Sequence, residues 1–276
     1  MNMPGLNGDG GRECTVPRMS ASETNEAYIL KTLENGLSVL MLFSPTRPRL
    51  SLKEIDDELH LGKSRTFKLV RTLLKMGFLK ESVPGPGYSL GPSVAVLGLT
   101  ALGQMDARRL AGPILAELAA STQETAILTV RNGDYSVVID KVDSPLSVRM
   151  AAEIGARGVL YAGASNLPLL AFGPEELREK YLSGEVTLKR FTDNTASDAK
   201  SLSKLLDAIR QRGYHVSKAE VEQDIMAVGA PVFDRRKSVD FCISVAGPLQ
   251  RMEPREEFII REVMKAAERL SSLLAV

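Results

Sequence analysis

The chain has little of what disulfide frameworks and metal sites are built from. Only two of its 276 residues are cysteine, Cys14 and Cys242, and they lie far apart in the sequence. A disulfide framework is therefore not expected, and Cys242, within an apolar strand pattern, should be a small buried side chain. The two histidines, His60 and His215, fall in different predicted domains, so a zinc site is not expected either.

Long hydrophobic runs and catalytic signatures are also missing. No segment approaches the ~18 consecutive apolar residues of a membrane-spanning helix, and no charged start followed by an apolar stretch opens the chain. A cytoplasmic location is the expectation. There is no Gly-x-Ser-x-Gly elbow, phosphate-binding loop or His-Glu-x-x-His pattern. We therefore predict a protein that is not an enzyme and has no catalytic residues, cofactor or metal.

Charge is distributed unevenly, although the net charge is only +1. Residues 28–91 hold 10 Lys and Arg against 6 Asp and Glu, a net charge of +4, whereas residues 1–27 and 92–276 each hold more acidic than basic residues. A basic segment is typical of nucleic-acid binding, but a surplus of this size is weak evidence alone.

Residues 51–91 have the pattern of a winged helix-turn-helix. Ser51 and Glu54 predict a capping box for one helix. Gly62 marks a turn, and Gly77 is suited to end a second helix that begins near Lys63. A short two-stranded wing follows. The second helix has apolar residues at three- and four-residue steps, which predict a packed face: Phe67, Leu69, Val70, Leu73 and Leu74.

The other face of this second helix is basic and carries hydroxyl groups, which suits a helix in the DNA major groove. Its candidate DNA contacts are Lys63, Ser64, Arg65, Thr66, Lys68 and Arg71. Arg65 and Thr66 are expected at base edges and the other four at phosphates. The alternative for the set is a solvated helix face. Arg47 and Arg49 are further candidates for backbone contacts, for which a plain surface position is equally plausible.

Four segments are expected along the chain: a disordered tail (1–27), a winged helix-turn-helix domain (28–91), a linker helix for dimerisation (92–106) and an effector-binding domain (107–276). The first domain should open with a helix over about 28–43. Between Glu81 and Asp106 there is no charged residue, and the helix-length segment 92–105 is apolar nearly all round. Such a helix must be covered. We expect a dimer interface, with burial inside one chain as the alternative.

After residue 106, helix and strand signals alternate, which predicts an α+β fold of helices around one antiparallel sheet. The signals are Gly112-Pro113 before a helix ending near Ser121, turns at Asn132-Gly133 and 234–238 within hairpins, a helix over 199–212 closed by Gly213, and Pro254 at the start of the last helix.

Two stretches of the chain resemble the IclR family of bacterial transcriptional regulators. One is LKEIDDELHLGKSRTFKLVRTLLKMGFL at 52–79, and the other is GYHVSKAEVEQDIMAVGAPVFD at 213–234, with ISVAGP at 243–248. The resemblance implies a winged helix joined by a helix to a GAF-like effector domain. It also implies a homodimer or dimer of dimers that binds a double-stranded DNA operator and a small-molecule effector, such as an organic acid or an aromatic compound.

The resemblance also implies where the effector binds. The family's pocket positions map onto Met150, Ala164, Ser165, Ser217, Ile225, Ala227, Ser244 and Ala246. Three positions depart from the family pattern. Asn166-Leu167 stands for Gly-Lys, Asp224 stands for a glycine, and the usual hairpin glycine is missing from 235–237. The first two departures lie by the pocket and bear on the class of ligand.

The sequence thus predicts an IclR-type DNA-binding transcriptional regulator whose operator binding is modulated by a small organic effector. Two alternatives stay open, a small-molecule-binding enzyme and a protein-interaction module, each with a vestigial winged helix. Glu220, Glu222 and Asp224 could form paired carboxylates, but a solvated edge or caps are more typical of such a run. The pocket serines have no general base beside them in the sequence.

Overall fold

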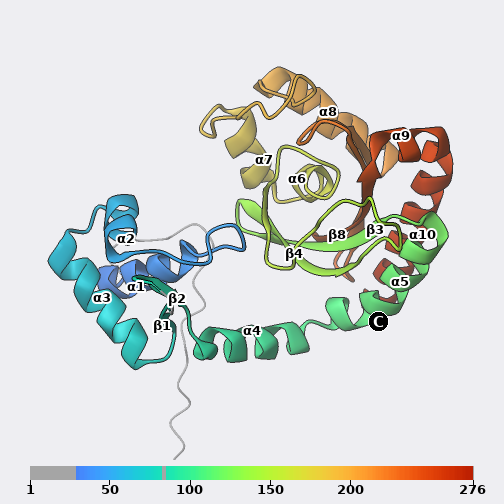
Figure 1. The fold of residues 1–276 in the computed structure, drawn as a ribbon. Coiled ribbons are helices and arrows are strands. Elements are labelled where there is room, and N and C mark those ends of the chain that lie inside the picture. The colour runs from blue at the N-terminus through green and yellow to red at the C-terminus, as the bar shows by residue number, and fades with distance from the viewer. Residues whose placement is uncertain (1–28, 83–84, 276) are drawn as a thin grey trace, which may run out of the picture.

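The computed structural model describes residues 29–82 and 85–275. The expected disordered tail, Cys14, the start of the first predicted helix and part of the wing turn lie outside the described residues. The described chain has two parts connected by a helix (Figure 1).

The N-terminal part contains three helices and a two-stranded wing. Its elements are α1 (Lys31–Met41), α2 (Leu52–Leu59), α3 (Lys63–Lys75), β1 (Leu79–Glu81) and β2 (Tyr88–Leu90). The predicted capping box is confirmed, because Glu54 N donates to Ser51 Oγ at 3.2 Å and Ser51 N donates to Glu54 Oε2 at 2.7 Å. Gly77 ends α3 with φ of +73°, as predicted.

A small apolar core holds these elements together. It is formed by Val39, Phe43, Leu50, Ile55, Leu69, Val70 and Leu79. The wing strands pair antiparallel from Leu79↔Leu90 to Glu81↔Tyr88, and Tyr88 exchanges backbone hydrogen bonds with Leu50. The wing is thereby anchored to the loop before α2, and α3 lies along the outer side of the unit (Figure 1).

Helix α4 (Pro92–Gln104) connects the two parts and begins with proline at its first turn, where no amide hydrogen is needed. Extended backbone at Met105 separates it from α5 (Asp106–Thr122). The prediction that this next helix begins after Gly112-Pro113 is wrong. Pro113 lies inside α5, because the buried side chains of Ala107, Ala111 and Leu115 hold the helix against the sheet despite the missing hydrogen bond.

The C-terminal part is built on one antiparallel six-stranded sheet, in the order β5-β4-β3-β8-β7-β6. The strands are β3 (Thr125–Asn132), β4 (Tyr135–Val142), β5 (Arg157–Val159), β6 (His215–Lys218), β7 (Ile225–Phe233) and β8 (Val239–Pro248). The remaining helices are α6 (Leu167–Ala171), α7 (Glu175–Leu182), α8 (Ala199–Arg212), α9 (Leu249–Met252) and α10 (Glu256–Leu274), with a 3-10 turn, η2 (Glu253–Arg255).

Helices cover both faces of this sheet, which confirms the predicted α+β class. Helices α5 and α10 bury one apolar cluster against it, and α6, α7 and α8 bury a second cluster on the opposite face (Figure 1). Because side chains alternate along β3, Leu128 belongs to the first cluster whereas Ile127 faces the α6 side.

The predicted helix 199–212 and both hairpins are confirmed. Asn132 pairs with Tyr135, so that Gly133 and Asp134 form the first turn, with φ of +63° at Gly133. The terminal helix begins at Glu256 rather than Pro254, because α9 and η2 occupy the residues before it. Among the described helices, none combines the length and the apolar character required to cross a membrane.

Candidate nucleic-acid interface and ligand cavity

Five of the predicted DNA contacts form an exposed surface on α3: Lys63, Ser64, Arg65, Lys68 and Arg71. Within the described part of the chain, none of its four cationic side chains forms an ion pair. Unpaired cations on a helix that follows a tight turn can neutralise phosphates without first breaking internal contacts.

Thr66 does not belong to this surface. Its side chain is fully buried, and its hydroxyl donates to Asp56 Oδ1 at 2.6 Å, which ties α3 to α2. The expectation that Thr66 reads a base edge is therefore wrong for this structure. On a helix, the residue after an exposed Arg65 is rotated by about a quarter turn, which here directs Thr66 into the core.

Phe67 differs from its prediction in the opposite direction to Thr66. It was expected on the packed face, but its side chain is 50% exposed and is not part of the apolar core of the N-terminal part. Sequence periodicity cannot decide between the flanks of an amphipathic helix, since the packing of α1 and α2 determines which flank is covered.

The two arginines proposed for backbone contacts differ in their surroundings. Arg47 Nη1 lies 2.7 Å from Glu58 Oε1, in an exposed ion pair with α2. Arg49 is exposed, and no ion pair engages it within the described residues. Both arginines precede α2 in the chain. Any contact that they make with the DNA backbone would therefore lie beside the contacts made by α3.

A small cavity of about 150 Å³ lies on the α6 side of the sheet. It is lined by Ile127, Met150, Gly163, Ala164, Ser165, Asn166, Ser217, Val221, Glu222, Ile225, Ala227 and Ala246. Seven of the eight residues mapped from the family resemblance are in this lining. The eighth, Ser244, is fully buried behind Ser165. Ile127 also lines the cavity but was not predicted to do so. The alternation of apolar residues along its strand could have indicated which face of the sheet it lies on.

The polar side chains at this cavity are the hydroxyls of Ser165 and Ser217, the amide of Asn166 and the carboxylate of Glu222. Ser165 Oγ and Ser244 Oγ are 2.6 Å apart. Two hydroxyls that share one hydrogen bond leave one O–H free to donate, and no other described residue accepts it. Ser217 is also buried without a hydrogen bond from its hydroxyl to a described residue. The cavity can therefore orient a small ligand that carries an acceptor oxygen.

The loop that carries Ala164 and Ser165 is held by the carboxylate of Glu220, whose side chain is 12% exposed. Glu220 Oε2 accepts from Gly163 N at 3.1 Å, and Glu220 Oε1 lies 2.8 Å from His215 Nε2. Arg212 Nη2 lies 3.0 Å from His215 Nδ1. A guanidinium group can only donate, so Nδ1 accepts and Nε2 donates to Glu220. The expectation of a solvated edge is thus wrong for Glu220, which positions the cavity loop.

A second anchor fixes the wall of the cavity that carries Met150. Thr125 Oγ1 donates to Met150 O at 3.1 Å. Arg251 binds the buried Glu124 through two nitrogens, at 2.5 and 2.6 Å, and donates to Val148 O at 3.0 Å. The hydrogen bonds that Arg251 donates to Glu124 raise the pKa of its guanidinium. The bond to Val148 O ties the segment before Met150 to α9, and the ion pair with Glu124 holds Arg251 in place for it.

The departures from the family pattern have local explanations. Asn166, in the place of the family glycine, donates to Ala162 O at 2.8 Å and accepts from Ser136 Oγ at 2.6 Å. A side chain at Gly158 would come within 3 Å of Asn166, so this glycine makes room for the amide. Asp224 adopts φ of +64°, the left-handed conformation that glycine usually supplies.

Among the described residues, no group of three or more His, Cys, Asp or Glu side chains could hold a metal ion. Cys242 is fully buried, as predicted, and burial raises the pKa of its thiol above the ordinary value. A thiol in this environment is a poor nucleophile.

A winged helix with an unpaired basic surface, joined to a sheet domain with a small cavity, is the architecture of a DNA-binding transcriptional regulator. The helix-turn-helix domain of IclR regulators matches residues 32–82, and the C-terminal domain of the bacterial transcriptional regulator IclR matches residues 99–272. The chain belongs to the IclR family of bacterial transcriptional regulators.

Individual relatives agree with this assignment. The HTH-type transcriptional regulator KipR of Bacillus subtilis is 33% identical over 242 residues, which cover 87% of this chain and 96% of KipR. An IclR transcriptional regulator from Alicyclobacillus acidocaldarius has a similar structure, with a TM-score of 0.79 and 27% identity over 89% of this chain and 99% of that one.

A third protein of similar structure was crystallised with a ligand. An IclR homologue from Microbacterium hydrocarbonoxydans, complexed with 4-hydroxybenzoate, has a TM-score of 0.74 and 24% identity, covering 88% of this chain and 98% of that one. At this identity the similarity demonstrates a common fold.

Proposed function

We propose that this protein binds a double-stranded operator through α3 as a homo-oligomer and that a small organic effector in the sheet-side cavity modulates this binding. The observation that carries the proposal is the pairing of an exposed, unpaired basic surface on α3 with a separate cavity whose lining includes seven of the eight family positions. We assign residues 28–91 to DNA binding, 92–106 to dimerisation and 107–276 to the effector.

Within α3, the roles of the exposed residues follow from charge and position. Arg65 lies in the first turn, the end of a recognition helix that usually approaches base edges, and we assign it to base contact. Lys63, Ser64, Lys68 and Arg71 are assigned to phosphates, with Arg47 and Arg49 beside them. Phosphate contacts contribute to affinity for any sequence, whereas a bidentate arginine discriminates between bases.

The first prediction concerns Arg65. Replacing it with alanine should weaken binding to the DNA upstream of the protein's own gene by about 10- to 100-fold, the value of one good base contact, and affect a scrambled duplex far less. Fluorescence-anisotropy titrations of both duplexes at two salt concentrations measure this difference. Lys204→Ala is the matched control, because Lys204 is an exposed cation on α8.

Equal binding of both duplexes by the wild-type protein would contradict operator recognition in that DNA. Weak binding that does not change with salt would favour the protein-interaction module, because loss of phosphate contacts with salt is a general property of DNA binding.

The effector proposal rests on the size and chemistry of the cavity. An apolar cavity of about 150 Å³ can hold a benzene-sized molecule. The hydroxyls of Ser165 and Ser217 supply orienting groups, with Ser244 behind Ser165, and Glu222 is the ionisable side chain in the lining. We infer a small monocyclic or short-chain organic compound with an acceptor oxygen. Its effect on DNA binding requires different affinities for the free and DNA-bound protein.

The second prediction tests this cavity with 4-hydroxybenzoate and other small aromatic and short carboxylic acids. A compound that raises the thermal midpoint and changes operator affinity should lose both effects in Ala227→Leu, which fills the cavity. Ala116→Leu makes the same substitution on the exposed side of α5 and should preserve them. A compound that acts equally on both variants binds elsewhere and would contradict the assignment.

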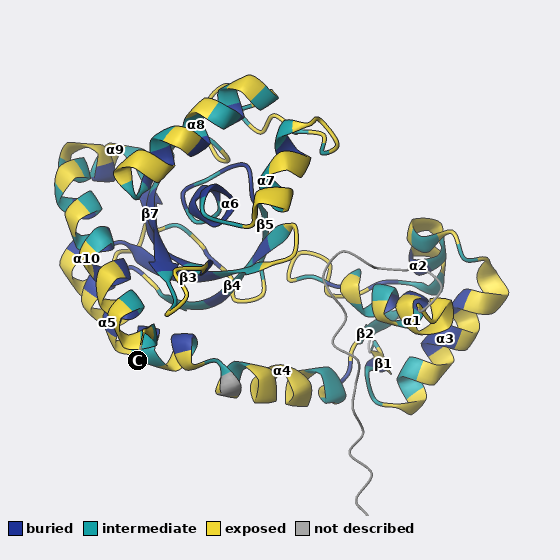
Figure 2. Ribbon diagram, turned by 180° about the vertical axis from the view of Figure 1, so that it is seen from behind, coloured by how far each residue is buried: buried dark blue, intermediate teal, exposed yellow. Residues whose placement is uncertain are grey.

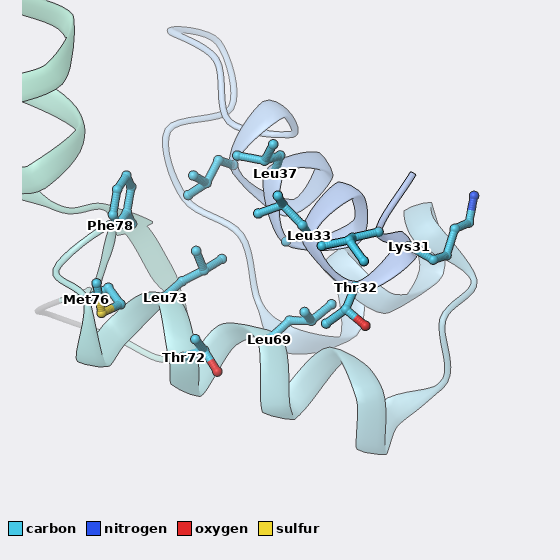
Figure 3. A pocket seen from close by; sticks show the side chains of 12 residues that line it. Lys31, Thr32, Leu33, Leu37, Leu69, Thr72, Leu73, Met76 and Phe78 are labelled. Atoms are coloured by element: carbon cyan, nitrogen blue, oxygen red, sulfur yellow. The ribbon is translucent and has the colours of Figure 1, made fainter. Parts of the chain in front are cut away.

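Dimerisation is the third component of the proposal. Val96, Leu97 and Leu99 on α4 are 61, 57 and 70% exposed, so no described part of the same chain covers them. Figure 2 shows most of α4 coloured as exposed. A groove between α1 and α3 is also apolar, and Leu33, Leu37, Leu69, Leu73, Met76 and Phe78 contribute to its walls (Figure 3). We infer that a second copy of the chain covers both surfaces.

A further inference from the structure

Phe67 is an exposed aromatic residue on the basic surface of α3. Its side chain is 50% exposed. It belongs neither to the apolar core of the N-terminal part nor to the groove between α1 and α3 that a second copy would cover. The proposed dimer therefore leaves the ring without an apolar partner.

The neighbours of Phe67 place it on the DNA-facing side. Ser64 lies three residues before it and Arg71 four residues after it, so both share its side of the helix. Lys68 follows it directly, and all three are exposed. The ring thus lies at the edge of a face whose exposed groups are assigned to phosphates, and it would come close to the base edges of a groove that this face enters.

The major groove offers one apolar group at base level. Thymine carries a C5 methyl there, and the other three bases present only donors, acceptors or a ring hydrogen at the corresponding edge. A phenyl ring gains free energy by burying that methyl group, and it gains no hydrogen bond from any base edge.

We propose that Phe67 contacts the C5 methyl of a thymine in each half-site of the operator and so specifies a T·A pair. The proposal rests on the proposed function, because it requires α3 to enter the major groove. It adds a base preference that comes from shape and burial alone, beside the hydrogen-bonding preference assigned to Arg65.

The test removes the methyl group from the DNA and the ring from the protein separately. An operator is first selected from random duplexes with the wild-type protein. Each thymine is then replaced by uracil, which differs only by this methyl. At one position per half-site, the wild-type protein should bind about fourfold more weakly for each lost methyl group. Phe67→Ala should bind the thymine and uracil operators equally.

The decisive readout is the difference between the uracil responses of the wild-type protein and Phe67→Ala. Uracil also alters the stiffness of the duplex, but this effect is the same for both proteins. Leu273→Ala, which truncates an exposed apolar side chain on α10, should keep the wild-type response. Phe67→Leu retains an apolar side chain and should keep part of the response, so a folding defect in Phe67→Ala cannot imitate the result.

Two failures are distinguishable. If a selected operator shows the same uracil response in wild type and Phe67→Ala, the thymine contact is refuted while operator recognition stands. If selection enriches no sequence at all, the proposed function fails and the contact fails with it.

Discussion

At the scale of single residues, neighbours on α3 have different roles because a helix rotates each side chain into a different environment. Arg65 is exposed, Thr66 is buried against α2, and Phe67 is exposed again. Thr66 Oγ1 lies 2.6 Å from Asp56 Oδ1 and 3.3 Å from Gly62 O, and it can donate to either oxygen. The hydroxyl therefore fixes the angle between α2 and α3 from inside the unit.

The third prediction follows from the burial of Thr66. Thr66→Val keeps the shape of the side chain but removes the donor to Asp56, which should lower the free energy of unfolding by about 1 kcal/mol. The base preference of the protein should not change. Urea denaturation measures the first effect and competition with single-base operator variants the second. A changed base preference at unaltered stability would restore Thr66 to the DNA interface.

The same residues show which parts of the candidate site the sequence could predict. A basic, hydroxyl-rich face was visible from periodicity, and the cavity residues followed from the family resemblance. The roles of Thr66 and Glu220 were not visible. Both depend on partners ten or more residues away, Asp56 for Thr66 and Gly163 for Glu220, and composition gives no information about such pairs.

At the scale of elements, the sequence predicted those whose ends are encoded locally. Helix α8 has Asp198 as its N-cap and Gly213 with φ of +80° after its last residue, and the predicted bounds agree with the structure. Strand β5 and helix α6 were not predicted. They are three and five residues long, too short for a period, and they form through pairing with β4 and burial among α7 and α8.

The fourth prediction concerns the turn between β7 and β8. Lys237 adopts φ of +59° within the segment 235–237, from which the hairpin glycine usual in the family is missing. A side chain in the left-handed region costs about 1–2 kcal/mol, and a glycine adds less than that in unfolded-chain entropy. Lys237→Gly should therefore raise the free energy of unfolding by about 0.5–1 kcal/mol.

Chemical denaturation measures this change, and Lys237→Ala is the control. Alanine removes the charge and the long side chain but retains Cβ, so its stability should stay near that of the wild type. A gain of the same size in both variants would assign the effect to charge instead of backbone conformation.

At the scale of the whole molecule, the two parts differ in how well one chain covers its own apolar surface. The sheet domain buries two clusters between its layers. The connecting helix α4 and the side of α1 that faces the groove with α3 expose large apolar side chains, including Leu33 and Leu37 of α1. The apolar surface that a single chain leaves exposed is thus concentrated near the basic surface of α3. An interface there would couple the separation of two α3 helices to the arrangement of the sheet domains, because α4 continues almost directly into α5.

The fifth prediction places the dimer at this uncovered surface. Leu97→Glu on α4 and Leu33→Glu on α1 should each convert a wild-type dimer into a monomer at micromolar concentration, because a buried unpaired carboxylate costs several kcal/mol. Sedimentation velocity measures the change. Leu273→Glu, at an exposed position of α10, should remain dimeric.

Both monomeric variants should keep the thermal response to any cavity ligand, since the sheet domain is intact. They should bind a single half-site of the operator but lose the added affinity that a second half-site gives to the dimer. A dimer that survives both substitutions would place the interface on the sheet domain, and the exposed face of α4 would then need another partner.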